Sequence, residues 1–135
     1  MPALRRSLLD SFAMLAFLNR ERGCERVRHL LREARASAEP VLMNEINIGE
    51  VYYVTARARS PEQAEAVLHR LETLPIQPVS NAFPDVIEAA RIKGRFGIAY
   101  ADAFAVATAL KHDAAIVTGD PEFRAVSRLV KIDWL

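Results

Sequence analysis

Four carboxylates stand where short apolar segments end or where helices are expected to begin. Asp10 directly follows the first apolar segment, and Asp120 follows the fourth within a few residues. Asp102 lies in the first turn of an expected helix, and Glu50 lies one or two turns into another. Carboxylate oxygens are hard ligands that suit Mg²⁺ or Mn²⁺. Such an ion lowers the pKa of a bound water and polarises an oxygen, so these acids together would form a hydrolytic metal centre.

The apolar surroundings of two of these acids favour a cation beside them. Asp102 interrupts the nearly continuous apolar segment 98–107, and Asp10 lies between two apolar stretches. An unpaired charge buried in such a segment is costly. Neither segment offers a basic residue at helical spacing, so a divalent ion would remove the cost for several acids at once.

A structural role explains each acid when it is taken singly. Acids near helix N-termini are stabilising, which suits Asp10 and Asp102. Asp120 precedes a proline that suits the first helical position. Asn47 and Glu50 match the spacing of a capping box, with asparagine in place of the usual serine or threonine.

The elements that must position these acids follow from hydrophobic spacing and helix signals. Strands are expected at residues 7–9, 41–43, 75–79, 114–117 and 129–132, with the two prolines of 75–79 indicating an edge. Helices are expected at residues 12–19, 24–36, from Asn44 or Asn47 to 58, from Ser60–Pro61 onward, 81–95 and 100–112, with Gly94 or Gly97 ending the fifth. In the first helix, Phe12, Leu15, Ala16 and Asn19 share one stripe.

Short apolar strands separated by helices predict a parallel sheet covered on both faces. Ligands of such sheets bind beyond the carboxyl ends of the strands. The acids that follow strands are therefore the expected site.

Length and composition predict a single globular domain over residues 1–135. The chain is 51% hydrophobic and 26% charged, which is typical of folded proteins. Its one cysteine, Cys24, forms no internal disulfide and no cysteine-based zinc site, so a cytoplasmic protein is expected. Residues 5–18 superficially resemble a signal peptide, but Asp10 interrupts the apolar run, and we expect folded structure there. No stretch reaches the roughly 18 apolar residues that suggest a membrane span.

Charge is unevenly distributed although the net charge is only +1. Residues 1–35 contain eight arginines and four acids. This basic segment is equally compatible with binding phosphates, with an ordinary solvated helix face and with contacts to an acidic partner.

Several other classes of site are disfavoured by the motifs. His29, His69 and His112 lack metalloprotease spacing, and the five glycines form neither a dinucleotide-binding motif nor a P-loop. A haloacid-dehalogenase phosphatase requires an Asp-x-Asp pair where this chain has Asp10-Ser11-Phe12. A receiver domain requires paired acids there and a later lysine after a strand, and neither is evident.

Four segments in order resemble the PIN domain family: residues 7–11, 44–50, 101–109 and 117–120. The resemblance covers nearly the whole chain, and its size is similar to that of the VapC toxins of type II toxin–antitoxin pairs. It implies a three-layer α/β/α sandwich with a short, mainly parallel sheet. It also implies a Mg²⁺- or Mn²⁺-dependent endoribonuclease that hydrolyses RNA phosphodiester bonds.

The resemblance assigns residues and partners as well. Asp10, Glu50, Asp102 and Asp120 match the catalytic, metal-binding acids, and Ser11 and Thr118 match the supporting hydroxyl positions. We hypothesise that Asp10 and Asp102 are direct ligands and that Glu50 and Asp120 act through water or a second ion.

One position departs from the family pattern, and one assignment has a rival. Gly119 occupies a position that is often polar in the family, and Glu45 competes with Glu50 but fits the spacing less well. The implied partners are RNA, a cognate antitoxin that inserts a segment, often with arginine, into the acidic site, and a second copy in a homodimer; no membrane is implied. The alternative is a non-catalytic PIN-fold module that binds RNA or protein, against which the presence of all four acids argues.

Overall fold

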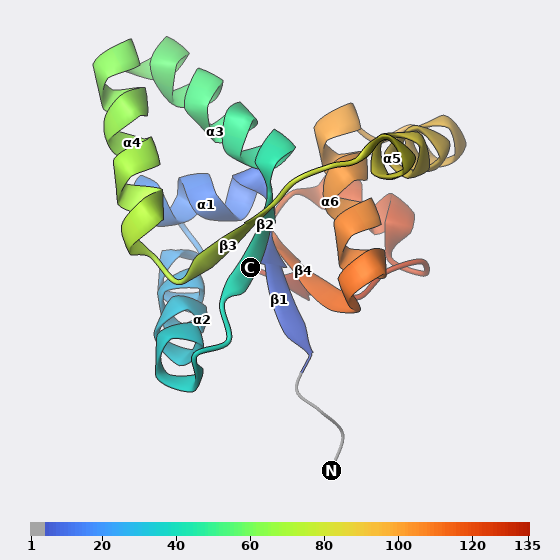
Figure 1. Ribbon diagram of the computed structural model, residues 1–135, viewed down its shortest axis with the longest axis horizontal. Helices are drawn as coiled ribbons and strands as arrows, with labels where there is room; N and C mark the ends of the chain where they lie inside the picture. Colours follow the sequence, from blue (N-terminus) through green and yellow to red (C-terminus); the bar gives the residue numbers. More distant parts are fainter. Residues whose placement is uncertain (1–4) are drawn as a thin grey trace.

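The structure is a computed structural model in which residues 5–135 are described (Figure 1). Along the chain the elements are β1 (Arg6–Leu9), α1 (Ser11–Leu18), α2 (Cys24–Ser37), β2 (Val41–Asn44), α3 (Glu45–Ala58), α4 (Pro61–Thr73), β3 (Ile76–Val79), α5 (Phe83–Phe96), α6 (Tyr100–His112), β4 (Ala114–Thr118), the 3₁₀ helix η1 (Pro121–Val126) and β5 (Ile132–Trp134).

The five strands form one sheet in the order β3-β2-β1-β4-β5, and every neighbouring pair is parallel. β1 lies at the centre, with Leu8 paired to Leu42 on one side and to Ile116 on the other. The carboxyl ends of β1, β2 and β4 therefore meet at the same edge. The proline-containing β3 lies at the outer edge, as the sequence predicts.

Successive strand residues supply two separate hydrophobic cores, because side chains alternate across a sheet. Leu8 and Ile116 belong to the core that packs against α5, α6 and η1. Leu9 and Val117 belong to the core on the other face, beneath α1, α2 and residues of α3 and α4. Figure 1 shows these helix groups on opposite sides of the sheet. The predicted three-layer α/β/α sandwich is confirmed.

Local signals set several helix ends at the expected residues. The Ser60 side chain accepts a hydrogen bond from the Gln63 backbone N–H at 3.1 Å, and Pro61 fills the first helical position. Gly97, with a φ of 70°, ends α5 in the left-handed conformation that glycine adopts at little cost. α6 spans the predicted residues 100–112.

Of the two expected starts of α3, Asn44 is correct, and the capping box of Asn47 and Glu50 is not formed. The helix cap of α3 is Asn44, whose side chain accepts from the Ile46 N–H at 2.9 Å, so Asn47 and Glu50 lie inside the helix and form no capping box. In α1 the buried residues are Ser11, Ala13, Met14, Ala16 and Phe17, so Ala16 is the one fully buried member of the stripe that helical spacing indicated. Phe12, on the same stripe, is exposed.

The last strand also begins later than expected. Leu129 and Val130 pack against the core from a turn, whereas the ladder pairs Ile132 with Ile116 and Trp134 with Thr118. Apolar residues can pack into a core from a turn as well as from a strand. The apolar residues of 129–132 therefore led to a predicted strand that begins too early.

Three arginines of the basic segment form contacts within the folded chain. Arg26 pairs with Asp133 at 3.0 Å, Arg28 pairs with Glu25 at 3.1 Å, and Arg35 donates to a backbone carbonyl of α4. Arg26 and Arg35 thus hold α2 to neighbouring elements, while the Arg28–Glu25 pair lies within the helix. The three earlier interpretations remain open for the rest of the segment. Within residues 5–135, no helix is long and apolar enough to cross a membrane.

Candidate active site

Four elements bring the acids to one edge of the sheet. Asp10 follows β1 and caps α1, while Asp120 follows β4 and caps η1. Asp102 lies in the first turn of α6, and Glu50 lies in the second turn of α3. The strand ends thus place two acids directly, and helices on the two opposite faces bring the other two towards them.

Asp10 is held rigidly although it is only 1% exposed. Its Oδ1 accepts the Ala13 backbone N–H at 2.8 Å, which is a helix cap, and its Oδ2 accepts the Thr118 hydroxyl at 2.5 Å. The same Thr118 hydroxyl oxygen accepts the backbone N–H of Asp120 at 3.0 Å. Thr118 therefore links the carboxylate after β1 to the backbone after β4.

Asp102 projects from a helix turn that is fastened to α3. The residue is 7% exposed, and the preceding carbonyl, that of Ala101, accepts a hydrogen bond from the Asn47 side-chain amide at 3.1 Å. Asn47 is fully buried, and its Oδ1 has no hydrogen-bond partner in the structure. Asn47 thus sets the spacing between α3, which carries Glu50, and the first turn of α6.

Glu50 is oriented by two hydroxyl groups. The Ser11 hydroxyl donates a short hydrogen bond to its Oε1, and the Tyr53 hydroxyl donates to its Oε2 at 3.5 Å. The rival Glu45 is exposed at the start of α3, and the structure shows no such contact for it. The two predicted supporting residues, Ser11 and Thr118, therefore each hydrogen-bond to one of the four predicted acids.

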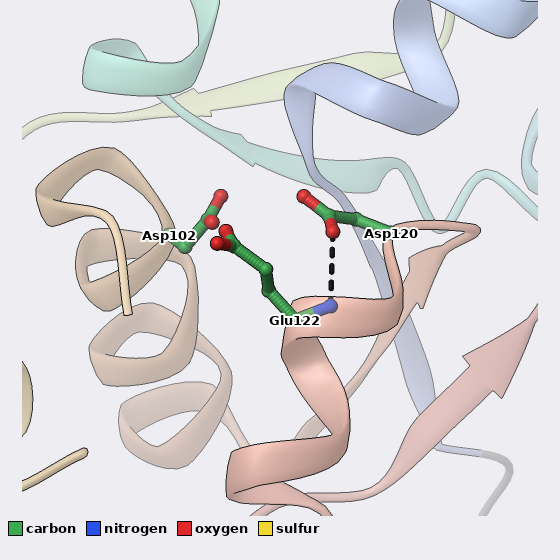
Figure 2. Close-up of side chains that lie close together, drawn as sticks. All are labelled: Asp102, Asp120 and Glu122. Atoms are coloured by element: carbon green, nitrogen blue, oxygen red, sulfur yellow. Dashed lines mark hydrogen bonds between the residues drawn. The ribbon is translucent and has the colours of Figure 1, made fainter. Parts of the chain in front are cut away.

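The tightest convergence includes Glu122, an acid that is not among the four predicted from the sequence. One carboxylate oxygen each of Asp102, Asp120 and Glu122 lies within 4.8 Å of the other two (Figure 2). Glu122 reaches this position because η1 turns back beside α6, where its N–H donates to Asp120 Oδ1 at 3.0 Å. The only sign of Glu122 in the sequence is that a second acid follows Asp120 by two residues. An acid in the first turn of a helix is already explained by helix stabilisation, so this spacing alone did not indicate a ligand.

Burial and mutual repulsion alter the titration of the two most enclosed acids. Burial raises the pKa of Asp10 from 3.8 to about 7, although the hydrogen bonds from Thr118 and Ala13 act to lower it. Burial also raises the pKa of Asp102 to about 7, and the negative charges of Asp120, Asp10, Glu50 and Glu122 add to this rise. The charges of the other four carboxylates thus all act on Asp102, and those of Asp120 and Glu50 also act on Asp10.

The donor set fits a divalent cation. Within the described chain, none of the five acids forms a salt bridge, whereas acids elsewhere pair with arginine, lysine or histidine. The site therefore gathers negative charge without protein cations to balance it. Hard carboxylate oxygens at this density suit Mg²⁺ or Mn²⁺, and no sulfur or imidazole ligand intervenes among them.

These features define a parallel α/β/α protein with an acidic site, suited to a divalent cation, at the carboxyl edge of its sheet. The PIN domain family model matches residues 7–129. This match covers most of the chain, which therefore belongs to the PIN domain family. Comparison with curated protein sequences gives no match.

Solved structures with the same fold come from toxin–antitoxin systems. The DNA-bound VapBC of Salmonella typhimurium is 14% identical, with a TM-score of 0.69 and coverage of 96% of this chain and 98% of that chain. VapBC2 of Rickettsia felis, bound to a promoter DNA fragment, has the same identity and coverages and a TM-score of 0.72. VapC20 of Mycobacterium tuberculosis, a toxin that cleaves the sarcin–ricin loop, is 19% identical, with a TM-score of 0.67 and coverage of 89% and 94%.

Proposed function

We propose that this chain is a metal-dependent endoribonuclease and the toxin of a toxin–antitoxin pair. The observation that carries the proposal is the cluster of five carboxylates without a protein cation, at the carboxyl edge of a PIN fold. The similarity of the fold to VapC20 and to VapBC toxins supports RNA as the substrate class.

Asp10, Glu50, Asp102 and Asp120 would hold the ion or ions, and we add Glu122 to this set. A divalent ion bound there would supply activated water and neutralise charge on the phosphate. Mg²⁺ is the expected ion, with Mn²⁺ as its substitute. The supporting hydroxyls of Thr118 and Ser11 fix the directions of Asp10 and Glu50, so the carboxylates need little reorganisation when the ion arrives.

The arrangement is more than a collection of helix caps. Asp10 and Asp120 do cap α1 and η1. Asp102 has no capping hydrogen bond, yet it is almost fully buried beside other acids. A cap needs neither this burial nor this repulsion, whereas a cation site explains both.

Cleavage of total cellular RNA tests the proposal directly. The wild-type protein is incubated with Mg²⁺, Mn²⁺ or EDTA beside Asp10→Asn and Asp102→Asn, and new 5′ ends are mapped. Asparagine caps a helix as well as aspartate does, so Asp10→Asn removes charge while it preserves the α1 cap. We expect metal-dependent cuts at a few sites that disappear in both variants.

Two other results would count against catalysis. Cleavage that survives both substitutions would remove these acids from the chemistry. Absence of cleavage by folded, antitoxin-free protein would favour the alternative, a PIN-fold module that binds RNA or protein without cutting it.

The partners and location follow from the same proposal. A cognate antitoxin would inhibit the enzyme by inserting a segment into the acidic site, where an arginine would supply the missing positive charge. The chain would act as a homodimer in the cytoplasm. Light scattering of the isolated protein and inhibition by the product of a neighbouring gene would test the dimer and the antitoxin separately.

A further inference from the structure

Phe12 is an exposed aromatic residue in an otherwise largely buried helix turn beside the acids. It follows Asp10 and Ser11, which are both buried, yet it is 42% exposed. α1 is strongly apolar, and most of its other apolar side chains enter the core. Exposure of a phenylalanine here has a hydrophobic cost, and packing within the chain does not account for it.

Gly119 has no side chain, and this leaves space for the Phe12 ring. A Cβ atom on Gly119 would lie 2.9 Å from Phe12 Cζ and closer still to Cε1. Among the described residues, the glycines with positive φ are Gly23 and Gly97, so Gly119 is not required by its backbone conformation. Its absence of a side chain instead allows the Phe12 ring to rest on the backbone between Thr118 and Asp120.

Two other exposed aromatic residues lie next to the acids, but their rings have partners. The Tyr53 ring has the Arg57 guanidinium 5.6 Å from its centroid. The Tyr100 ring packs against Phe104, with 5.0 Å between centroids. In the described part of the chain no ring or guanidinium stacks on Phe12, which meets Gly119 through the edge atoms Cδ1, Cε1 and Cζ.

We propose that Phe12 is a positioning residue on which a nucleobase next to the scissile phosphate stacks. This inference rests on the proposed ribonuclease function. A phosphate held at the acidic site carries its own base, and Phe12 lies two residues from Asp10 and in contact with the backbone beside Asp120. Stacking on an aromatic ring requires an unstacked base, so the preferred substrate is a single-stranded or looped RNA segment.

A ring on which a base stacks must be held in a fixed position, and this distinguishes it from an apolar residue that is merely tolerated at the surface. The ring rests against the end of β4, where Thr118 is fully buried. The Phe12 backbone lies two residues after Asp10, the first of the acids. A base bound there would be oriented relative to the carboxylates rather than simply retained. Removal of the ring should therefore raise KM and also lower the precision of the cut.

The experiment uses a synthetic single-stranded RNA that contains the mapped cleavage site. Phe12→Leu and Phe12→Tyr are compared with wild type, and Leu110→Ala, an exposed apolar residue at the far end of α6, is the control. Base stacking of this kind changes affinity by roughly tenfold or more. We expect KM to rise about tenfold in Phe12→Leu, with tyrosine retaining the wild-type value and Leu110→Ala unaffected.

The first part of a second measurement uses wild-type enzyme alone, so it does not depend on how the variants fold. Replacement of the base next to the scissile phosphate by an abasic site should raise KM for the wild-type enzyme by the same factor. Phe12→Leu should show no further loss on that abasic RNA. Quenching of 2-aminopurine at the same position should occur with wild type and be absent with Phe12→Leu.

The outcomes separate this inference from the proposed function. If wild type cuts no RNA with either metal, both are wrong. If wild type cuts but Phe12→Leu and the abasic RNA retain normal KM, the ribonuclease stands and the stacking role is overturned. The same holds if Phe12→Leu changes only inhibition by the antitoxin, since the ring would then belong to a protein interface.

Discussion

The hydroxyl of Thr118, at the end of β4, donates a 2.5 Å hydrogen bond to Asp10 Oδ2, at the end of β1. Both residues are almost completely buried, and they are 108 positions apart in the sequence. Because this bond favours the ionised carboxylate, it opposes the rise in the pKa of Asp10 that burial causes. Thr118 thus keeps a deeply buried acid available for a cation near neutral pH.

Removal of this hydroxyl should shift the pH dependence of the enzyme. In Thr118→Val the pKa of Asp10 should rise further above about 7, since the hydrogen bond that lowers it is lost. Mg²⁺-dependent cleavage should then begin at higher pH, with roughly tenfold weaker metal binding at pH 7. The pH–rate profile and a Mn²⁺ titration measure these two effects.

A matched control is available in α6. Thr108 is also a buried threonine with two hydrogen bonds, to Asn44 and to the Phe104 carbonyl. Thr108→Val should destabilise the fold by about 1–3 kcal/mol without moving the pH profile. Equal pH shifts in the two variants would show that loss of stability, rather than the Asp10 bond, causes the effect.

The acids should make the metal-free protein less stable as pH rises. Asp10 and Asp102 have a pKa of about 7 in the folded chain and near 3.8 when unfolded. Between about pH 4 and 7 the folded state therefore binds more protons, so its free energy of unfolding falls as pH increases. Below this window both states are protonated, and above it the full penalty, on the order of a few kcal/mol, is present.

Thermal unfolding with and without Mg²⁺ at pH 5 and pH 8 measures this dependence. We expect the ion to raise the Tm much more at pH 8, where it binds ionised carboxylates and removes their repulsion. The difference from Asp10→Asn/Asp102→Asn, in which both acids are neutral, isolates these two groups from the rest of the chain. A wild-type apo stability that is flat across the window, relative to this variant, would contradict the raised pKa values.

The edge of the sheet could be predicted from sequence because strands and their acids are local features. The predicted strands 7–9 and 114–117 end at or shortly before Asp10 and Asp120, and parallel pairing of β1 with β4 places these acids at one edge. α6 was predicted to the residue because an alanine-rich apolar run is bounded by clear ends. The assignment of Glu50 over Glu45 still required the family resemblance.

Long-range packing decided what the sequence did not reveal. Glu122 reaches Asp102 because Phe123 and Val126 anchor η1 in the core beside α6, and this contact joins two elements across the end of β4. Helical spacing placed Phe12 on one stripe with Leu15, Ala16 and Asn19, but spacing alone does not state which side of a short apolar helix faces the core. The absence of a side chain at Gly119 became meaningful only when the ring was seen against it.

The convergence of Asp102, Asp120 and Glu122 predicts that Glu122 contributes to cation binding. Glu122→Gln should weaken Mn²⁺ binding by about tenfold, and Asp102→Asn by at least as much. Glu45→Gln is the matched control, since Glu45 is an exposed acid at the start of α3 that touches none of the cluster. Calorimetric titration measures all three. Unchanged affinity in Glu122→Gln would leave the ion with the four acids first predicted.

The last prediction concerns the contact between Phe12 and Gly119. In Gly119→Ala the new methyl group would overlap the ring, so Phe12 must move away from the backbone between Thr118 and Asp120. If Phe12 positions a base, this movement should raise KM about tenfold, as the loss of the ring does. Combining Gly119→Ala with Phe12→Leu should add little, because both changes disrupt one contact.

Gly94→Ala supplies the control for this glycine. Its added methyl group would meet no atom within 4 Å, and the position lies inside α5, so the variant should gain about 0.5–1 kcal/mol of stability and keep its kinetics. Steady-state cleavage of the mapped RNA by the four variants gives the coupling energy. Fully additive losses in the double variant would mean that Gly119→Ala acts through the neighbouring Asp120 rather than through the Phe12 ring.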